Sequence, residues 1–545
     1  MTEREFVAGP QWARWLGFAL GPLLALTVYL LLPAAERSAA GEVIGGLGPA
    51  GRAAAAVGVL MAVWWLSEAL PLEATALVPL VAFPLLGVLP IKEAAAPYAN
   101  EVIFLFLGGL ILGVGMERWG LHRRVALNTI GGVGTSPAMV VGGVMLATAM
   151  ISMWVSNTAT AVMMLPIGMS VVRMMEGARR GEARTGAEEK APSGLEDSAS
   201  SADQSDGGGA FATCLLLGIA YAASIGGVAT LVGSPPNAVM RGFASAHGLE
   251  PPMTFARWMW IGVPTAAVFL PVAWLVLTRV IYRLPRGRAP GLRQEVARQR
   301  RGLGPMSGGE WAVFIVFVCT AGLWVFRGVL VEGLGLRFVR GGVEHDIVTD
   351  SGIAIAAALA LFAIPVGRGA RAAAEDGGDP VAHPGIQFAM DWRTASGVPW
   401  GVLVLFGGGL SLAAAVSATG VDKYLGGLLE GLGGVPPLLV LLAVTATMVF
   451  LTEVASNTAV ATAFMPVMFV LAGKLGVEPY ALMVPVALGA SYAFMMPMGT
   501  PPNALVFATG RVTIRQMAGT GLVLNLAAVA LITAVCWWWA PVVLD

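Results

Sequence analysis

The chain has 545 residues, of which 57% are apolar and 12% are charged, and its formal net charge is zero. Because a soluble domain carries about 25% charged residues, this composition excludes an ordinary soluble protein and indicates many membrane spans. The zero net charge gives no sign of nucleic-acid binding. The three cysteines lie in apolar runs, without the spacing of a metal site or a disulfide framework.

The amino-terminal segment, residues 1–51, contains the first apolar run and lacks a clear signal-peptide cleavage site, so we interpret it as a retained span. A membrane core of roughly 30 Å needs about 20 apolar residues per helix. Runs that fit one span each are 13–33, 52–72, 74–90, 101–117, 256–282, 308–333, 350–366, 398–418 and 518–541.

Four other apolar stretches are interrupted. Two of them, 137–175 and 436–474, each contain a central Ser-Asn-Thr sequence and predict re-entrant hairpins. The other two, 211–248 and 480–512, are cut by Pro-Pro-Asn, and consecutive prolines remove backbone donors, which indicates broken helices. The fold class that follows is an all-α polytopic membrane protein with about 11 transmembrane helices plus two re-entrant hairpins.

Two polar connections set the expected orientation. Residues 177–209 are rich in Gly, Ala, Ser, Glu and Asp, and we expect a disordered linker there. Residues 283–307 hold seven arginines, and by the positive-inside rule they form a cytoplasmic basic loop. Counting spans places the linker and the amino terminus in the cytoplasm and the carboxyl terminus outside the cell (inner) membrane.

An internal repeat relates the two halves of the chain. Phe106-Leu-Gly-Gly-Leu110 matches Phe406-Gly-Gly-Gly-Leu410, and Ser156-Asn-Thr-Ala159 matches Ser456-Asn-Thr-Ala459, both at an offset of 300. Ser234-Pro-Pro-Asn237 matches Thr500-Pro-Pro-Asn503 at an offset of 266. The two hairpins would then enter from opposite faces. We predict two inverted repeats, a plan common in secondary transporters; their expected bounds are 52–282, with scaffold spans 52–117, and 308–545, with scaffold spans 308–418.

The helix interruptions carry the expected chemistry. Irregular backbone at membrane depth is tolerated only where it is buried or lines a wet cavity. Half-helix amino ends suit a carboxylate, and freed carbonyls suit a sodium ion. A single Ser-Asn-Thr triplet would more often serve helix packing or capping, but two triplets, each followed by a broken helix, favour a binding site. With no fixed cation in the motifs, a dianion would need co-bound cations.

Other polar features have simpler explanations. Glu453 precedes the second triplet and can anchor the hairpin tip or tune a cation site. We expect solvated or capping roles for the acids near span ends, which are Glu68, Glu73, Glu101 and Glu117. Paired acids, a Ser/His/Asp set and a phosphate loop are all absent from the sequence. We therefore expect a protein that is not an enzyme.

The motifs resemble the divalent anion:sodium symporter family, in its dicarboxylate branch. The resemblance rests on both Ser-Asn-Thr motifs, both Pro-Pro-Asn breaks, Trp119-Gly-Leu-His-Arg-Arg124 and Met496-Pro-Met-Gly-Thr-Pro-Pro-Asn503, and it runs from about residue 52 to the carboxyl end. It implies a homodimer with an elevator mechanism, in which a scaffold domain holds the interface and a transport domain carries the hairpins and broken helices.

The resemblance also implies site residues. One sodium site would comprise Ser152, Ser156, Asn157 and Gly233, and the other Thr452, Ala455, Asn457 and Gly499. Substrate carboxylates would meet Asn157, Thr158, Ser234, Asn457, Thr458, Thr500 and Pro501. Gly499 departs from the alanine common in the family, and the change preserves a backbone ligand.

The expected function is sodium-coupled import of C4-dicarboxylates such as succinate, malate or fumarate. Sodium is the expected coupling ion, and no other cofactor is expected. Within the family, the alternatives are a dicarboxylate exchanger and a citrate or sulfate symporter. A channel or a receptor is disfavoured because an occluded midplane site suits alternating access.

Overall fold

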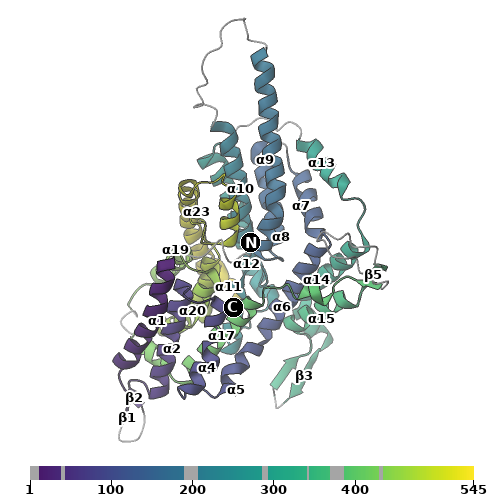
Figure 1. The fold of residues 1–545 in the computed structure, drawn as a ribbon. Helices are drawn as coiled ribbons and strands as arrows, with labels where there is room; N and C mark the ends of the chain where they lie inside the picture. The colour runs from purple at the N-terminus through teal and green to yellow at the C-terminus, as the bar shows by residue number, and fades with distance from the viewer. Residues whose placement is uncertain are drawn as a thin grey trace, which may run out of the picture.

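The computed structural model describes residues 11–37, 43–134, 136–188, 206–284, 292–340, 343–368, 386–428 and 434–544. Within these ranges the chain is mostly helical (Figure 1), and ten helices are long and apolar enough to cross a membrane. The predicted fold class, an all-α polytopic membrane protein, is confirmed.

The first half of the chain is helical apart from one short strand pair. Its helices are α1 (Gln11–Leu31), α2 (Pro49–Ser67), α3 (Leu72–Thr75), α4 (Val78–Leu85), α5 (Ile91–Ala95), the 3₁₀ turn η2 (Ala96–Ala99), α6 (Glu101–Arg118), α7 (Leu121–Gly132), α8 (Pro137–Ser152), α9 (Asn157–Glu188), α10 (Asp206–Gly227), α11 (Pro235–Ala246) and α12 (Phe255–Leu275), which continues into the π-helical turn η3 (Val276–Ile281).

The second half repeats much of this order. Its helices are α13 (Leu292–Gly302), α14 (Gly308–Leu334), α15 (Asp350–Ala363), α16 (Trp392–Ala395), α17 (Trp400–Ala418), α18 (Val421–Leu428), α19 (Pro437–Leu451), α20 (Asn457–Leu475), α21 (Pro479–Ala490), α22 (Pro501–Ala508), α23 (Ile514–Ala534), the π-helical turn η5 (Val535–Trp539) and α24 (Ala540–Leu544).

Three antiparallel strand pairs were not predicted. They are β1 (Glu36–Arg37) with β2 (Val43–Gly45), β3 (Arg337–Arg340) with β4 (Val343–Asp346), and β5 (Pro365–Arg368) with β6 (Ile386–Phe388). Each pair joins the ends of consecutive helices and adds nothing to the core, which is built from helices.

One predicted span is wrong as a single helix. Residues 74–90 form the end of α3 and then α4, because Pro79 lies in the first turn of α4 and Pro84 lies near its end. The count also differs from the predicted figure of about 11. The ten long helices include the second arms of both hairpins, but they exclude three predicted spans whose helices are shorter: the α3–α4 segment, α15 and the broken helix that begins with α21.

The hairpins and broken helices are present where the sequence predicts them. Helices α8 and α9 meet at a tip formed by residues 153–156, and α19 and α20 meet at 452–456. The breaks span 228–234 and 491–500. The proline pairs do not lie inside the breaks. They occupy the first positions of α11 and α22. Proline is tolerated there because N–H groups in the first turn of a helix have no hydrogen-bond partner within the helix.

Both polar connections are more helical than expected. The prediction of disorder over 177–209 is wrong at both ends, since α9 runs to Glu188 and α10 begins at Asp206; alanine, arginine and glutamate after residue 177 favour helix. Residues 189–205 lie outside the described ranges. Within the predicted basic loop 283–307, residues 292–302 form the amphipathic helix α13, which packs against α7.

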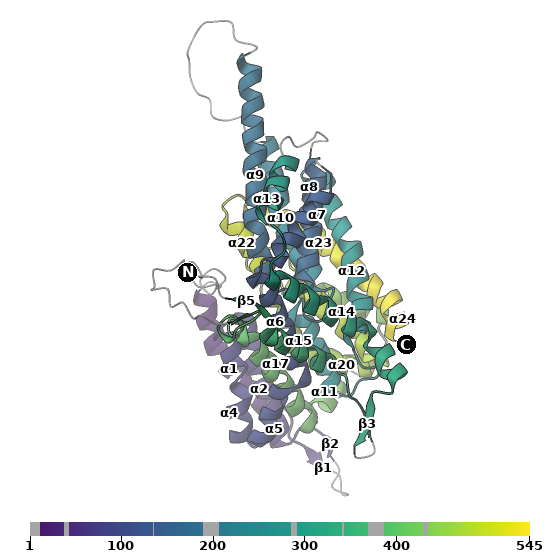
Figure 2. The ribbon, with the colours of Figure 1, turned by 90° about the vertical axis from the view of Figure 1, so that its right-hand side faces the viewer.

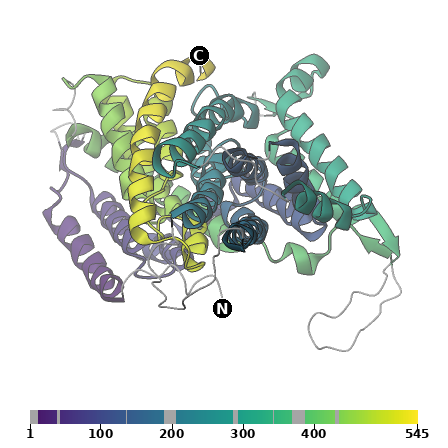
Figure 3. The ribbon, with the colours of Figure 1, turned by 90° about the horizontal axis from the view of Figure 1, so that it is seen from above.

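The long axis of the molecule has two distinct ends. Helix α9 projects at one end, which we call the linker end, and the β1–β2 and β3–β4 pairs lie at the other, which we call the strand end (Figures 1 and 2). Helices α7–α10 lie toward the linker end, whereas α1, α2, α4 and α5 lie toward the strand end. In Figure 3, α1 (purple) and the teal segment around residue 320 form opposite margins, with the yellow carboxyl-terminal helices between them.

Candidate functional site

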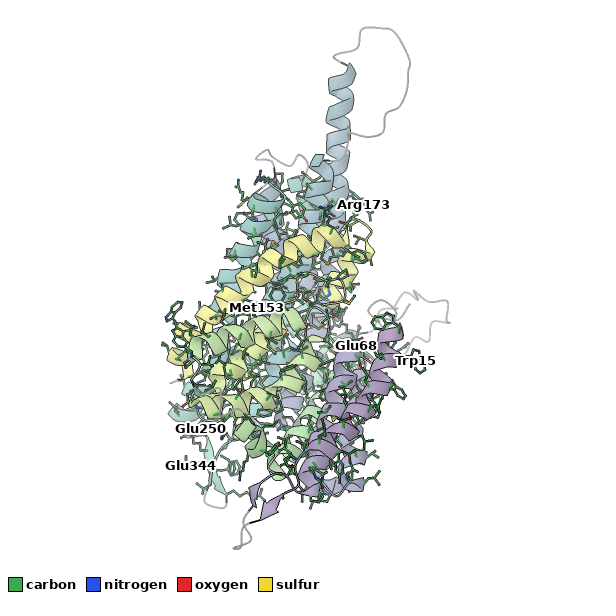
Figure 4. All side chains as sticks on the ribbon, turned by 90° about the vertical axis from the view of Figure 1, so that its left-hand side faces the viewer. Trp15, Glu68, Met153, Arg173, Glu250 and Glu344 are labelled. Atoms are coloured by element: carbon green, nitrogen blue, oxygen red, sulfur yellow. The ribbon has the colours of Figure 1, made fainter. Side chains whose placement is uncertain are left out.

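A cavity of about 560 Å³ lies where both hairpin tips and both helix breaks meet. Met153, in the first tip, lies at mid-height, between Arg173 toward the linker end and Glu250 and Glu344 toward the strand end (Figure 4). The polar residues that line the cavity at these tips and breaks are Ser156, Asn157, Thr158, Ser234, Ser456, Asn457, Thr458 and Thr500.

Four helix amino ends lie at this cavity. Helices α9 and α20 begin at Asn157 and Asn457, and α11 and α22 begin immediately after Ser234 and Thr500. Each amino end carries a partial positive charge, which favours an anion. Helices α9 and α20 also present backbone N–H groups in their first turns, whereas α11 and α22 begin with two prolines, which have no N–H. Among the described residues, none that lines the cavity is a lysine or an arginine. Attraction for an anion therefore comes from backbone dipoles, amides and hydroxyls.

An oxygen cluster lies behind the first hairpin tip, where α8 ends. Ser152 Oγ lies 2.7 Å from Asn157 Oδ1 and 2.7 Å from the carbonyl oxygen of Ala223, in the last turn of α10. The hydroxyl has one hydrogen and can donate to only one of these acceptors. The carboxyl ends of α8 and α10 add partial negative charge. Such a set of oxygens suits a hard cation.

The second hairpin tip carries a matching cluster. Thr452 Oγ1 lies 2.6 Å from Asn457 Oδ1 and 2.9 Å from the carbonyl oxygen of Ala490, the last residue of α21. In both clusters the asparagine side chain uses its oxygen toward the hydroxyl, and no hydrogen bond of its Nδ2 is recorded within the described part of the chain. Each Nδ2 therefore remains available to a ligand in the cavity.

Two further asparagines hold the helix breaks in shape. Asn237 Nδ2 donates to the carbonyl oxygen of Thr230 at 2.8 Å, and Asn503 Nδ2 donates to that of Met496 at 3.0 Å. Across the breaks, Ser234 and Ser491 share a hydroxyl hydrogen bond of 2.9 Å. The two asparagines satisfy backbone carbonyls in the breaks that lie outside any helix. The breaks are thus built into the fold.

Gly233 lies where backbone carbonyls converge on the first break. A Cβ added at Gly233 would lie 2.5 Å from the oxygen of Gly227, 2.9 Å from that of Met153 and 3.0 Å from that of Ser152. The position has no room for a side chain. Glycine lets the break approach the hairpin tip closely.

Glu453, in the second hairpin tip, anchors that tip to the second break. Anchoring the tip is one of the two roles predicted for it. Its carboxylate accepts hydrogen bonds from the backbone N–H groups of Phe494, Met495 and Met496 at 2.6–2.9 Å and from Asn525 Nδ2 at 2.7 Å. At the matching position of the first half the chain has Met153. The two tips therefore differ in one buried acid.

The structure brings the sequence-predicted residues together around one cavity. All seven predicted substrate residues line it, as do Ser156, Gly233 and Gly499. Ser152, Thr452 and Ala455 are buried and do not line it. Residues that sequence reasoning missed are Thr230, Asn237, Ser491, Asn503 and Asn525. The asparagines of the Pro-Pro-Asn motifs carried a signal, because they recur in both halves.

The cavity extends toward the linker-facing ends of the surrounding helices. Glu68 follows the end of α2, Glu117 lies in the last turn of α6, and Pro399 and Val402 lie at the start of α17. Toward the strand end, α6 and α17 pack against α11 and leave a void of only about 10 Å³. The site is therefore open on one side and closed on the other. Glu68 and Glu117, for which the sequence predicts solvated or capping roles, lie at helix ends and line the cavity.

Two solved transporters have a similar fold. The chain is similar to the Alcanivorax borkumensis YdaH transporter, with a TM-score of 0.55, 15% identity and coverage of 98% of each chain. It is also similar to Neisseria gonorrhoeae MtrF, with a TM-score of 0.54, 12% identity and coverage of 96% of this chain and 94% of the other. At these identities the likeness concerns the fold alone.

Curated relatives are closer in sequence. The sodium-dependent dicarboxylate transporter SdcS of Staphylococcus saprophyticus is 37% identical over 530 residues, which cover 97% of this chain and 92% of the relative. SdcS of Staphylococcus aureus is 36% identical over 543 residues, with coverage of 99% and 93%. The sequence profile of the sodium:sulfate symporter transmembrane region matches residues 19–544. The chain is thus a multi-pass membrane transporter and belongs to the sodium:sulfate symporter family, the divalent anion:sodium symporters whose motifs it carries.

Proposed function

We propose that this chain imports C4-dicarboxylates, such as succinate, malate or fumarate, coupled to sodium ions. The observation that carries the proposal is the arrangement of helix ends: four amino ends at one cavity, and carboxyl ends at an oxygen cluster behind each hairpin tip. Amino ends attract an anion and carboxyl ends attract a cation. The names of the SdcS relatives agree with this pairing of ligands.

The cavity suits a small dianion. Its volume of about 560 Å³ lies within the usual range for small-molecule sites, about 300–1,000 Å³. Asn157 and Thr158 on one side and Asn457 and Thr458 on the other would each meet one carboxylate, together with Ser234, Thr500 and the amino end at Pro501. Two equivalent sets of donors match a ligand with two acidic ends.

Sodium ions would occupy the two oxygen clusters. Ser152, Ser156, Asn157 and Gly233 would hold one ion, and Thr452, Ala455, Asn457 and Gly499 would hold the other. Each asparagine can offer its oxygen to sodium and its Nδ2 to the substrate. This sharing would couple the two ligands, because an ion that fixes the asparagine also fixes the donor that the dianion meets.

Transport would proceed by an elevator movement between two bodies. The scaffold would comprise α2–α6 and α14–α17, and the transport domain would comprise the hairpins, the broken helices α10–α11 and α21–α22, and α12 and α23. The cavity lies between these sets, and α8–α10 are displaced toward the linker end relative to α2, α4 and α5 (Figures 1 and 2). Two inverted repeats and a homodimer complete the proposal.

The orientation follows from charge. Among described residues, Arg283, Arg300 and Arg301 lie in the segment that leads to α14, and α13 packs on α7 near the linker end. By the positive-inside rule the linker end would face the cytoplasm. The cavity would then be open inward, with the carboxyl terminus on the outer side of the cell membrane.

The test is uptake of labelled succinate by the purified full chain in proteoliposomes. An inward sodium gradient should drive accumulation, and a potassium or choline gradient of equal size should not. Uptake that needs internal dicarboxylate and ignores sodium would establish an exchanger. Sodium-driven uptake of sulfate or citrate with no succinate uptake would support the proposed sodium coupling and would show that the substrate is not a C4-dicarboxylate.

A further inference from the structure

Asp350, the first residue of α15, is fully buried although it lies at the strand end, four residues after β4. Its Oδ2 accepts the backbone N–H of Phe255 at 2.9 Å and lies 3.3 Å from Arg241 Nη2, and its Oδ1 lies 3.2 Å from Arg327 Nη1. A buried carboxylate stays charged only when it is paired. Asp350 is therefore a buried carboxylate that two arginines and one backbone N–H surround.

The partners come from both proposed bodies. Arg327 on α14 lies in the scaffold with Asp350, whereas Arg241 on α11 and Phe255 at the start of α12 lie in the transport domain. Helix α11 begins beside the cavity at Pro235, so Arg241 is six residues, or about 9 Å, further along the same rigid helix. A shift of the site relative to the scaffold must therefore move Arg241 relative to Asp350.

The two arginines differ in their other partners. Arg327 has a second acceptor on the scaffold, Asp346, at 2.7 Å. Among the described residues, Arg241 has only Glu101 within ion-pair distance besides Asp350, at 3.7 Å, and the Glu101 side chain is 48% exposed. Arg241 Nη1 is also buried without a hydrogen-bond partner within the described ranges. Arg241 is thus held mainly by Asp350, and water can satisfy it if the two separate.

The contact lies on the closed side of the site. Val102 on α6 is 1% exposed and packs beneath α11, whereas Val402 on α17, at the same position of the other half, lines the open cavity. His247 at the end of α11 also contacts Ser417 on α17, with 3.2 Å between Nε2 and Oγ. Opening the strand end would expose Val102 and break the Asp350–Arg241 and His247–Ser417 contacts.

We propose that Asp350 and Arg241 form an ion-pair lock between scaffold and transport domain, which must open once in every transport cycle. The proposal rests on the elevator movement of the proposed function. The lock stabilises only the state that is closed at the strand end. A ligand or contact that binds one state alone shifts the balance between states by its full differential free energy. The strength of the lock therefore sets how often the site faces the strand end.

The test measures accessibility of single cysteines in the full chain, in liposomes, after Cys214, Cys319 and Cys536 are replaced by alanine. Val102→Cys reports opening at the strand end and Val402→Cys reports opening at the linker end, each by its rate of labelling with a membrane-impermeant maleimide added to that side. Asp350→Asn removes the charge without changing the shape. Arg241→Gln is the second variant, and it leaves Asp350 paired with Arg327.

Both variants should speed labelling of Val102→Cys and slow labelling of Val402→Cys by about tenfold, a factor typical of coupling between sites. The double variant should add little to either single change, because both remove the same contact. Asp346→Asn is the matched control: it breaks pairs with Arg327 and Arg337 inside the scaffold alone, and both labelling rates should stay unchanged.

The outcomes separate the lock from the proposed function. Unchanged labelling rates in Arg241→Gln, or an equal shift in Asp346→Asn, would overturn the lock even if sodium drives succinate uptake. A shift confined to Asp350→Asn and Arg241→Gln would support the lock even if the transported anion proved to be another. If Asp350→Asn fails to fold, Arg241→Gln alone decides.

Discussion

Replacing Gly233 with alanine would test the first proposed sodium site by steric means. The added Cβ would lie 2.5 Å from the carbonyl oxygen of Gly227, with the oxygens of Met153 and Ser152 at 2.9 and 3.0 Å. Carbon–oxygen contacts in proteins are about 3.3–3.6 Å, so the break must move by several tenths of an ångström. All three neighbours are backbone, and none can rotate away. The oxygens around the proposed ion would be spread apart.

Overpacking of this kind costs roughly 1–3 kcal/mol, which corresponds to about five-fold to more than hundred-fold in affinity at 1.4 kcal/mol per decade. We expect the sodium concentration that gives half-maximal succinate uptake to rise by that factor. The assay is a sodium titration of uptake in proteoliposomes, with sodium-dependent thermal stabilisation of the detergent-solubilised protein as a measurement independent of transport.

Gly499→Ala is the matched control, at the equivalent position of the second break. Its added Cβ would lie 3.0 Å from Ala493 Cβ, 3.0 Å from Glu453 Oε2 and 3.3 Å from the carbonyl oxygen of Met496. These contacts are longer, and side-chain atoms make the two shortest. We expect a much smaller change in sodium dependence. If Gly233→Ala kept the sodium dependence of the unaltered chain, or if Gly499→Ala lost as much, the steric reasoning would be refuted.

Asn157→Ala and Asn457→Ala should each weaken the sodium and the succinate dependence of uptake together, by roughly 1–3 kcal/mol for the unsatisfied partners; exposed Asn128→Ala is the control, and separate effects on the two ligands would contradict a shared side chain. Glu453→Gln should lower the unfolding temperature, because its new N–H₂ group faces backbone donors, and an unchanged temperature would rule out the anchor. Burial raises the pKa of Glu68 at the cavity mouth. Its charge therefore disappears at a higher pH than that of a free carboxyl, so Glu68→Gln should bind succinate more tightly near neutral pH, and the ratio to the unaltered chain should approach one as pH falls; a pH-independent ratio would contradict this.

Much of the membrane architecture could be predicted from the sequence, because long apolar runs and duplicated motifs are strong signals. The tips at Ser156 and Ser456 and both breaks were predicted within a few residues. The role of the prolines was not predicted correctly, since Pro235 and Pro501 begin helices instead of interrupting them. The low hydrophobicity of residues 177–188 is typical of disorder and hides the extension of α9 to Glu188, although helix propensity alone favours helix there.

The candidate site was predictable where polar residues interrupt apolar runs in duplicate. The residues that lie behind these cavity-lining residues could not be predicted from the sequence. Ser491 forms a hydrogen bond with Ser234 although the two are far apart in sequence, and Asn525 on α23 donates a hydrogen bond to Glu453. Such contacts depend on how helices pack, and a single sequence carries no record of that packing. For the same reason the sequence gives no signal for Asp350. Its partners are Arg241, Arg327 and the backbone N–H of Phe255, and they lie on three different helices.

The near-equivalence of the two cavity halves has a consequence for orientation. Asn157 and Asn457 occupy equivalent positions in the two halves, and Ser234 differs from its counterpart Thr500 by one methyl group. A ligand with identical ends can enter either way round and meet almost the same donors, so it has two bound arrangements of similar energy. A ligand with one distinguished end, such as a hydroxyl beside one acid group, has only one best arrangement. The extra methyl of Thr500, at the cavity, and the buried Glu453, behind the second tip, are then features that distinguish the two halves.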